Sequence, residues 1–324
     1  GKVLGAGTDT MAVEIRENEP LSRHTVFQVG GPARFFVTAD SREDFIASLR
    51  AARHAGLPWV ILGAGSNVLV SDRGFDGIVI RPTGGTFEVA GSRIRADAGL
   101  PMARVAAEAL GAGLRGFEWA VGVPGTIGGS VRGNAGCFGG EMADVVRTVT
   151  VFNTLTGDTE EWSAEAAEFG YRDSAFKRRP ELAVLAATIG LSPGDPLEGQ
   201  RRILEHILYR AQTQDIGTQS AGCMFKNVPW GRRGIDAGRL AGRFPELLPF
   251  GAHPAIPAGF LIDQVGLKGR QVGGVRVSGR HANFFLNTGG ASAEEVIMLA
   301  GIAKEHVHRR YGLLLEEEIQ YVGF

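Results

Sequence analysis

A glycine-dense stretch near the middle of the chain limits its possible folds more than any other feature. Residues 122–136 read GVPGTIGGSVRGNAG, so six of these fifteen residues are glycine and only one is charged. Glycine allows positive φ angles and lets a ligand lie directly against main-chain N–H groups. Successive amides, flanked by the side chains of Thr126, Ser130 and Asn134, form concave sites that suit a diphosphate. Considered alone, the stretch is equally compatible with a glycine-rich structural turn.

A second short loop, GAGSN at residues 63–67, favours the ligand-binding interpretation. It lies between the apolar runs 59–62 and 68–70, and we therefore predict a turn between two strands. The loop is not a P-loop, because no Gly-Lys-Ser/Thr follows it. It is not a dinucleotide-binding fingerprint either, because no helix opens at Val68.

A formal G-x-G-x-x-G motif also occurs, at Gly111, Gly113 and Gly116. It follows the helix-like stretch 102–110 rather than a strand. We therefore predict that Gly111 caps a helix and that this motif binds no nucleotide.

Composition excludes several classes of protein. The chain has 324 residues, of which 44% are hydrophobic, and this length is sufficient for two or three globular domains. A formal charge of −1 without a basic stripe argues against nucleic-acid binding. No apolar run is long enough to span a membrane and no leader segment is recognisable, so we expect a cytoplasmic protein. The first ten residues are expected to be a disordered extension, with Met11 as the native start.

The two cysteines give no sign of a disulfide framework or a metal site. Cys137 and Cys223 lie 86 positions apart, and neither has the close cysteine or histidine neighbours of a zinc site. Cys223 follows a Ser-Ala-Gly turn, which would expose its sulfur, whereas a lone thiol such as Cys137 is ordinarily a small core residue.

The apolar periodicity predicts an α+β chain. It begins with a β-α-β unit, and the last strand is expected to rejoin an earlier sheet. The predicted helices are 42–54, capped by Ser41 or Asp40, 102–110, 198–212, and 293–311, capped by Ser292. The predicted strands are 35–37, 59–62, 78–81, 87–89, 94–96, 145–152, 160–162 and 313–322.

Three polar clusters also attract attention: residues 171–174, 220–227 and 316–318. Each has an ordinary explanation, since Asp173 could cap a helix and the three glutamates could form a solvated edge. In a regular strand, Glu316 and Glu318 would share one face and Glu317 would take the other.

Seven motifs in order give the chain a family resemblance. They are GAGSNVLV (63–70), GVPGTIGG with NAG (122–136), YRDS (171–174), SAGCxFKN (220–227), AGxLID (258–263), HANF (281–284) and LExE (315–318). Together they closely resemble the UDP-N-acetylenolpyruvoylglucosamine reductase family, and the resemblance spans about residues 20–323. Seven ordered motifs are far more specific than any one of them.

This resemblance implies a vanillyl-alcohol-oxidase-like FAD-binding fold with a third, substrate-binding α+β domain. Residues 13–84 and 312–324 would form the first FAD-binding subdomain, residues 85–212 the second, and residues 213–311 the substrate-binding domain. The implied reaction is the NADPH-dependent, FAD-mediated reduction of UDP-N-acetylglucosamine enolpyruvate to UDP-N-acetylmuramate, in peptidoglycan precursor synthesis. FAD would be bound non-covalently, no metal is implied, and we expect a monomer.

The resemblance also assigns roles to individual residues. The implied catalytic residues are Arg172, Cys223 as the proton donor, and Glu318. The implied substrate-binding residues are Tyr171, Arg210, Lys226 and Asn227. The implied FAD-binding residues are Gly63, Ala64, Gly65, Ser66, Asn67, Pro124, Gly125, Thr126, Gly128, Gly129, Ser130, Asn134, Ala135 and Gly136. The short interval between Arg172 and Cys223 resembles the shorter family type, which lacks a tyrosine-bearing loop over the substrate.

Two positions depart from the family pattern. The proton donor is commonly serine, whereas this chain has Cys223, and proline commonly follows the Lys-Asn pair, whereas here Val228 precedes Pro229. A cysteine is chemically suitable as the donor, because a thiol is mostly protonated at neutral pH and is still a far stronger acid than an alcohol.

Two other functions are compatible with the sequence. The first is a flavin oxidase or dehydrogenase of the same fold that acts on an alcohol or sugar, often with FAD attached through histidine. The second is a nucleotide-sugar-binding protein without redox chemistry, whose preparation would be colourless. Flavin content and the mode of flavin attachment would distinguish them from the reductase.

Overall fold

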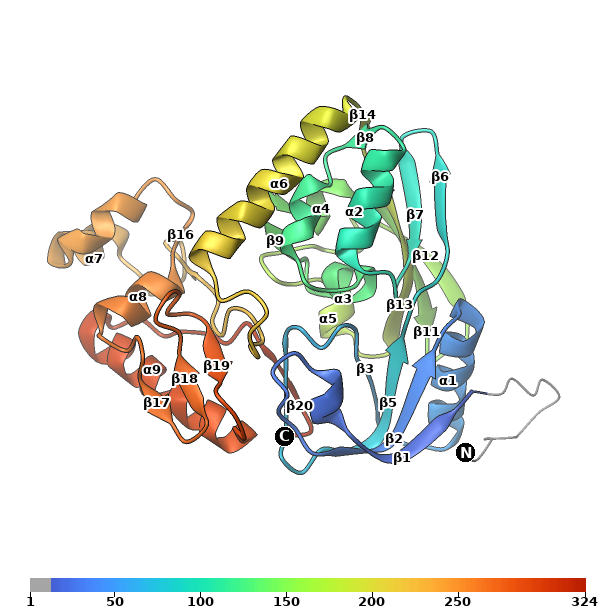
Figure 1. Ribbon diagram of the computed structural model, residues 1–324, viewed down its shortest axis with the longest axis horizontal. Coiled ribbons are helices and arrows are strands. Elements are labelled where there is room, and N and C mark those ends of the chain that lie inside the picture. The colour runs from blue at the N-terminus through green and yellow to red at the C-terminus, as the bar shows by residue number, and fades with distance from the viewer. Residues whose placement is uncertain (1–12) are drawn as a thin grey trace. The chain divides into compact units, whose positions relative to one another are not determined.

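The computed structural model describes residues 13–324, so the expected N-terminal extension and the start at Met11 lie outside the described residues. The chain forms two compact units, each built from separated segments (Figure 1). Unit 1 comprises residues 13–20, 32–65 and 75–212, and unit 2 comprises residues 21–31, 66–74 and 213–324. The three-domain division suggested by the sequence remains a prediction.

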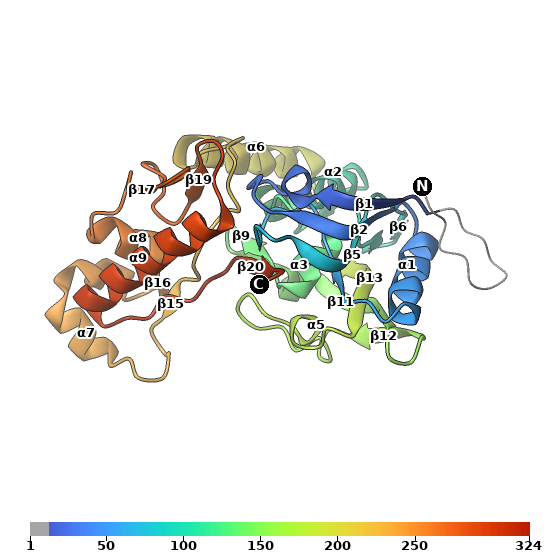
Figure 2. The same cartoon turned by 90° about the horizontal axis from the view of Figure 1, so that it is seen from below.

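A four-stranded sheet with the order β1-β2-β5-β3 opens unit 1. The expected β-α-β unit is present: β2 and β3 both run parallel to β5, which lies between them. Ser41 caps helix α1 by accepting a hydrogen bond from Asp44 N at 3.0 Å. Helix α1 packs its apolar face on β2 and β5 (Figures 1 and 2). The elements are β1 (Ile15–Pro20), β2 (Pro32–Ala39), α1 (Arg42–His54), β3 (Trp59–Ile61) and β5 (Phe75–Pro82).

A five-stranded antiparallel sheet forms the second half of unit 1. Its strand order is β12-β11-β13-β7-β6, and the buried face contributes to a core shared with helices α2 and α3. The sheet contains β6 (Phe87–Ala90), β7 (Arg93–Asp97), β11 (Val146–Asn153), β12 (Thr159–Ser163) and β13 (Leu182–Gly190). The helices are α2 (Met102–Gly111), α3 (Ile127–Arg132) and α6 (Pro196–Thr213).

Short elements connect these layers of unit 1. The 3-10 helix η2 precedes the glycine-dense loop, and the hairpin β9–β10 follows it. These elements are β8 (Leu114–Arg115), η2 (Glu118–Gly122), β9 (Gly136–Cys137), β10 (Gly140–Glu141), α4 (Met142–Val145), α5 (Ala175–Arg178) and β14 (Ser192–Pro193).

Unit 2 has its own core, into which segments distant in sequence are gathered. Helix α9 packs on α8 and on the sheet β17-β18-β19, and the two helices lie side by side in both views (Figures 1 and 2). Phe27, Val29 and Leu69 join this core from the N-terminal part of the chain. The helices of unit 2 are η1 (Leu21–His24), α7 (Ala237–Arg243), η3 (Pro245–Phe250), α8 (Ala258–Gln264) and α9 (Ala293–Tyr311). Its strands are β4 (Val68–Val70), β15 (Val228–Pro229), β16 (Ala255–Ile256), β17 (Gln271–Val272), β18 (Val275–Val277), β19 (Phe285–Asn287) and β20 (Gln320–Val322).

The final strand is much shorter than expected. Only β20 pairs regularly, and it runs parallel to β4 in a two-stranded sheet. Residues 313–319 are irregular apart from one bridge between Glu317 and Phe225, so the expected strand over 313–322 is wrong for most of its length. The predicted alternation of Glu316, Glu317 and Glu318 therefore does not apply, because it requires a continuous strand.

Two predicted helix ends are displaced by one residue. Gly111 is the last residue of α2 and Ala112 takes the cap position. Ser174, rather than Asp173, is the N-cap of α5, and Asp173 instead forms an ion pair with Arg178.

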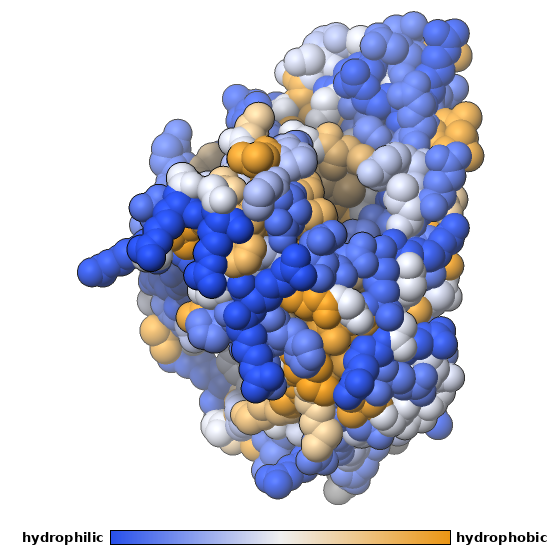
Figure 3. Space-filling model, turned by 90° about the vertical axis from the view of Figure 1, so that its left-hand side faces the viewer, coloured by the Kyte–Doolittle hydropathy of each residue, from blue (hydrophilic) through white to orange (hydrophobic). Residues whose placement is uncertain are grey.

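On the face drawn in Figure 3, hydrophilic side chains predominate and hydrophobic ones gather in limited areas. Within residues 13–324, no helix has both the length and the apolar character needed to cross a bilayer.

Candidate functional site

The first glycine loop presents main-chain donors that the protein itself does not use. Among the residues described, the amides of Gly63, Ala64 and Gly65 donate to no acceptor. Gly65 has a φ of +66°, the left-handed conformation that occurs in anion-binding main-chain nests. A Cβ atom at Gly63 would lie only 2.7 Å from Thr126 Oγ1, so this loop and the glycine-dense stretch meet within unit 1. Three open amides at this junction fit the diphosphate of a dinucleotide cofactor.

The glycine-dense stretch is anchored firmly to unit 1. Thr126 caps α3 and accepts a hydrogen bond from Gly129 N at 3.4 Å. The amides of Ile127 and Gly128 donate to the carbonyls of Leu100 and Ala98, at 2.9 and 3.0 Å. These amides are therefore committed to the fold, and a ligand would meet the open donors of the neighbouring loop instead.

Asn134 links this stretch to the turn that carries Arg172. Its side chain is completely buried, donating to Gly170 O at 2.8 Å and accepting from Ala143 N at 2.9 Å. The residue has a φ of +44°, a left-handed conformation that asparagine tolerates better than most residues. Its contact with the cofactor remains a prediction.

Tyr171 and Arg172 occupy the tip of a tight turn. Gly170 and Asp173 exchange main-chain hydrogen bonds of 3.0 and 3.2 Å. Arg172 has a φ of +52°, and its carbonyl accepts a bond from Lys177 Nζ at 2.9 Å. Arginine pays a conformational cost in this region, so the contacts around the turn must hold it there.

The Arg172 guanidinium is directed to the end of the glycine-dense stretch. It donates to the carbonyl oxygens of Asn134, at 3.4 Å, and Gly136, at 3.0 Å. It also lies 5.4 Å from the centre of the Tyr171 ring, which is 43% exposed. These contacts fix the direction of the guanidinium.

Arg210, the predicted contact for the UDP group, lies on α6 in the same unit. Burial raises the pKa of the Cys137 thiol, and the guanidinium groups of Arg210 and Arg172 act on that pKa in the opposite direction. Both cations are therefore close enough to Cys137 to influence its charge. The thiol is held in its protonated form near these two arginines.

In unit 2, Cys223 lies in a short extended segment clamped by neighbours on both sides. On one side it forms a bridge with Phe284, and Met224 N donates to Asn283 O at 2.8 Å. The Asn283 side chain is buried and completes this side: its Oδ1 accepts from Phe225 N at 2.9 Å and its Nδ2 donates to Phe225 O at 2.8 Å.

The other side of this segment is formed by residues 316–318. Glu318 N donates to Met224 O, and Lys226 N donates to Glu316 O, both at 2.8 Å. Main-chain pairing thus places Glu318 opposite Met224, the residue that follows Cys223. The structure brings the segments of two predicted catalytic residues together in this way.

Other predicted site residues of unit 2 surround this segment. Asn67 Nδ2 donates to Glu318 O at 3.3 Å, which links the second half of the GAGSN loop to the C-terminal segment. Asn227 Oδ1 accepts from Ala258 N at 3.1 Å and so fixes the start of α8. The neighbouring acids are engaged elsewhere, because Glu316 pairs with Arg232 and Glu317 with Lys304.

The predicted residues thus fall into two groups. Unit 1 contains Gly63, Ala64, Gly65, Pro124, Gly125, Thr126, Gly128, Gly129, Ser130, Asn134, Ala135, Gly136, Tyr171, Arg172 and Arg210, and unit 2 contains Ser66, Asn67, Cys223, Lys226, Asn227 and Glu318. Within residues 13–324, no cluster of three metal-ligating side chains is present.

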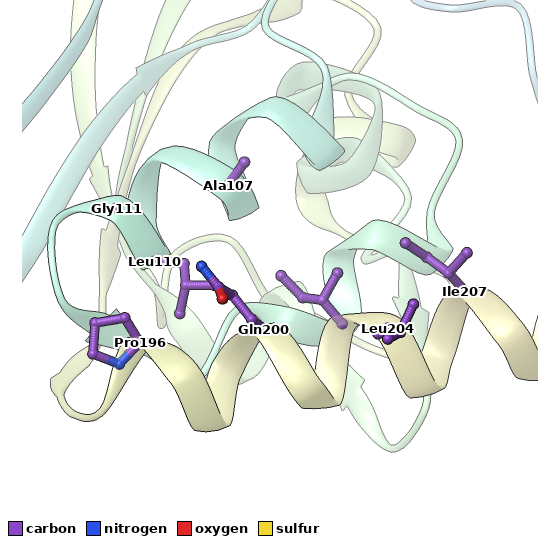
Figure 4. Close-up of a pocket in the computed structure, with 8 residues that line it drawn as sticks. Ala107, Leu110, Gly111, Pro196, Gln200, Leu204 and Ile207 are labelled. Atoms are coloured by element: carbon purple, nitrogen blue, oxygen red, sulfur yellow. The ribbon is translucent and has the colours of Figure 1, made fainter.

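A separate apolar groove of about 420 Å³ contains none of the predicted residues. It lies between α2 and α6, where Leu204 and Ile207 of α6 and Leu110 of α2 contribute aliphatic walls (Figure 4). It has no charged lining residue, so it does not fit a diphosphate or a carboxylate.

The sequence motifs do not indicate the surroundings of the two arginines in unit 1. From the sequence Cys137 is expected to be an ordinary core residue, and no motif includes Phe138 or His206. The spacing of His206 and Arg210, four residues apart on a predicted helix, was the available signal that the two share a face.

Comparison with known proteins identifies the family. Residues 213–322 match the family model described as UDP-N-acetylenolpyruvoylglucosamine reductase, C-terminal domain, and residues 33–163 match an FAD binding domain. The UDP-N-acetylenolpyruvoylglucosamine reductase of Synechococcus sp. is 38% identical over 95% of this chain and 91% of that protein. The chain belongs to this reductase family.

Further relatives agree with the assignment. The Carboxydothermus hydrogenoformans reductase is 35% identical over 98% of this chain and 96% of its own length. The crystal structure of the Thermus caldophilus reductase is 33% identical, has a TM-score of 0.74 and covers 96% of this chain and 99% of that one. The predicted family and the FAD-binding α+β fold are confirmed, and the chain is a flavin-dependent oxidoreductase.

Proposed function

We propose that this reductase-family member converts UDP-N-acetylglucosamine enolpyruvate to UDP-N-acetylmuramate for peptidoglycan precursors, with NADPH as electron donor and non-covalent FAD as cofactor. The observation that carries the proposal is the family match over both units, reinforced by the pairing of the Cys223 segment with the Glu318 segment. A cytoplasmic, monomeric enzyme is part of the proposal.

The open amides of Gly63, Ala64 and Gly65 would hold the FAD diphosphate, with Thr126 beside them. Ser66 and Asn67 continue that loop, and Pro124–Gly136 would line the cofactor from the second glycine stretch. Bound FAD supplies two-electron redox chemistry. Unsatisfied main-chain N–H groups can bind the negatively charged diphosphate of FAD, whereas an apolar wall without donors could not.

The net reaction adds a hydride equivalent to the methylene carbon of the enolpyruvyl group and a proton to the neighbouring carbon. We assign Cys223 as the source of that proton, since its thiol is a suitable acid at neutral pH. Arg172 would stabilise the negative charge that develops beside the substrate carboxylate. Glu318 would assist at the same centre, and Tyr171, Arg210, Lys226 and Asn227 would bind the substrate.

An anaerobic experiment tests this function. The purified protein is reduced with NADPH while the visible flavin absorbance is followed, and UDP-N-acetylglucosamine enolpyruvate is then added. Rapid recovery of the flavin absorbance with formation of UDP-N-acetylmuramate is expected. Recovery only with oxygen would reject the proposed substrate, and a colourless protein would reject the flavin chemistry.

A further inference from the structure

The short hairpin β9–β10, residues 136–141, accepts a hydrogen bond from Arg172 and lies within the electrostatic influence of Arg210, the two arginines of unit 1 to which the proposed function assigns roles. We propose that Phe138, at its tip, is a positioning residue that holds Arg210 of α6 at a fixed distance from Arg172. The inference rests on the proposed function, because that function assigns roles to Arg172 and Arg210, and the inference explains how the distance between them is maintained.

Three consecutive residues of the hairpin make the relevant contacts. The carbonyl of Gly136 accepts a hydrogen bond from Arg172 at 3.0 Å. The thiol of Cys137 lies within the electrostatic influence of Arg172 and Arg210. The ring of Phe138 stacks on that of His206, with centroids 4.0 Å apart and 9° between the planes. Strand β9 and the first residue of the turn that follows it thus connect the two arginines.

The contact with His206 bears directly on Arg210. The two residues are four apart on α6, so they lie on the same face, one turn from each other. This is the face that α6 packs inward: Gly199 is buried, and Ile203, His206 and Arg210 are half-buried, whereas most other residues of the helix are exposed. The Phe138 ring, stacked on His206, therefore limits the rotation and the sliding of α6 one turn before Arg210.

The backbone of Phe138 indicates that this contact is important. Phe138 has a φ of +52° and Gly139 a φ of +79°, a left-handed pair that forms the two-residue turn of the hairpin. Glycine or asparagine suits such a position, whereas a bulky aromatic residue is strained there. The strain is offset by the stack on His206 and by the edge-to-face contact with Tyr209 at 5.9 Å.

The hairpin is itself too tightly packed to drift. A Cβ atom at Gly140 would lie 2.4 Å from the Trp119 ring, and one at Gly122 would lie 2.6 Å from Cys137 Sγ. Both strands therefore press against η2. The Phe138 ring is carried on a rigid base, as a positioning residue requires.

Phe138→Gly tests the proposal, because glycine keeps the left-handed turn and removes only the ring. The KM for UDP-N-acetylglucosamine enolpyruvate should rise ~10-fold, as expected when one charged contact is weakened. The rate of flavin reduction by NADPH and the flavin content should stay within about twofold, since this rate does not need the substrate arginines. Phe138→Tyr, which retains the ring, should have the same KM as the parent protein.

Two further variants check the route of the effect. His206→Ala should raise the KM like Phe138→Gly, and the double variant should be no worse than Phe138→Gly alone, because both remove the same contact. Leu208→Ala, at a residue that is 51% exposed on the same helix, should leave the KM unchanged.

A readout without turnover separates this inference from the proposed function. In a Cys223→Ser background, Cys137 is the one remaining thiol of the sequence. Its alkylation by iodoacetamide should be roughly ten times faster after Phe138→Gly, because the contact that holds α6 over the hairpin is lost. If the parent protein does not turn over the substrate, the proposed function fails and the alkylation rate alone decides. An unchanged alkylation rate, or an unchanged KM in an active protein, would overturn the positioning role.

Discussion

Two buried asparagines hold the segments that carry the proposed chemistry. Asn134 and Asn283 are 0% and 2% exposed, and each uses its amide oxygen and nitrogen on main-chain groups. Asn134 joins the glycine-dense stretch to the Arg172 turn, and Asn283 does for Phe225 what a neighbouring strand would do. A side-chain amide carries its acceptor and its donor on two different atoms, so it can pair with an N–H and a C=O of an irregular segment at the same time.

Asn283→Ala should strongly destabilise unit 2, because it leaves the N–H and C=O of Phe225 buried without partners. Each unsatisfied group costs about 1–3 kcal/mol, so the free energy of unfolding should fall by ~2–6 kcal/mol. Urea unfolding followed by circular dichroism measures the change. Gln271→Ala is the matched control, since that amide bonds only an exposed carbonyl, Gly273 O at 2.8 Å, and its loss should change stability by less than about 0.5 kcal/mol.

Cys223 allows a test of proton donation. Cys223→Ala should leave flavin reduction by NADPH nearly intact and slow flavin reoxidation by the enolpyruvyl substrate by roughly 10²–10⁴-fold, the usual contribution of a general acid. Stopped-flow absorbance resolves the two half-reactions. Cys223→Ser should retain substantial activity, whereas equal damage to both half-reactions in the alanine variant would contradict the role.

At the scale of elements, the sequence predicted best where local signals agree. Helix α9 has Ser292 and Glu295 in a capping box and ends at Gly312 with a φ of +70°, and its predicted bounds are confirmed. The strand over 313–322 failed because alternating apolar residues also occur in an irregular segment that is clamped by single main-chain bonds. Such clamps come from residues far away in the chain, such as Asn67 and Met224, and no local pattern reports them.

At the candidate site, too, local sequence patterns reveal only part of the structure. The motifs identified the glycine loops, because a segment that presents main-chain amides to a ligand is rich in glycine. They did not identify the contact of Phe138 with His206, which depends on how α6 packs on the hairpin. A φ of +52° at a phenylalanine is likewise invisible in a sequence, since the residue is unfavourable there and only tertiary contacts maintain it.

Asp72 stabilises the start of a helix that lies more than 200 residues further along the chain. Its carboxylate accepts hydrogen bonds from Ala293 N at 2.8 Å and Glu294 N at 3.1 Å, at the start of α9. Asp72→Ala should lower the free energy of unfolding by ~1 kcal/mol, through loss of these bonds and of the favourable charge at a helix N-terminus.

The control for this prediction is Asp76→Ala. The Asp76 side chain is 89% exposed and pairs with Arg34 at 3.4 Å, a type of contact worth little in water. Its loss should leave the urea midpoint almost unchanged. Equal shifts for the two variants would show that the bonds of Asp72 to α9 do not contribute.

At the scale of the whole molecule, sequence order and structural unit do not coincide. The C-terminal family model begins at residue 213, but the core of unit 2 also contains Phe27, Val29 and Leu69. The two short segments that carry them, 21–31 and 66–74, are too small to be recognised as parts of a distant unit by composition. Loss of the apolar side chains of these segments would leave a cavity among core residues that are only a few per cent exposed.

A fragment consisting of residues 213–324 should therefore lack fixed tertiary packing, with weak near-ultraviolet circular dichroism and poor dispersion of amide NMR signals. In the full chain, Phe27→Ala should lower the stability of unit 2 by ~3–5 kcal/mol, the cost of emptying a buried aromatic site. Val26→Ala, at the preceding residue, which is 39% exposed, should cost much less. Hydrogen exchange of the α9 amides measures the loss within unit 2 itself. A cooperatively melting fragment, or similar exchange in the two variants, would mean that the core of unit 2 is complete without its N-terminal segments.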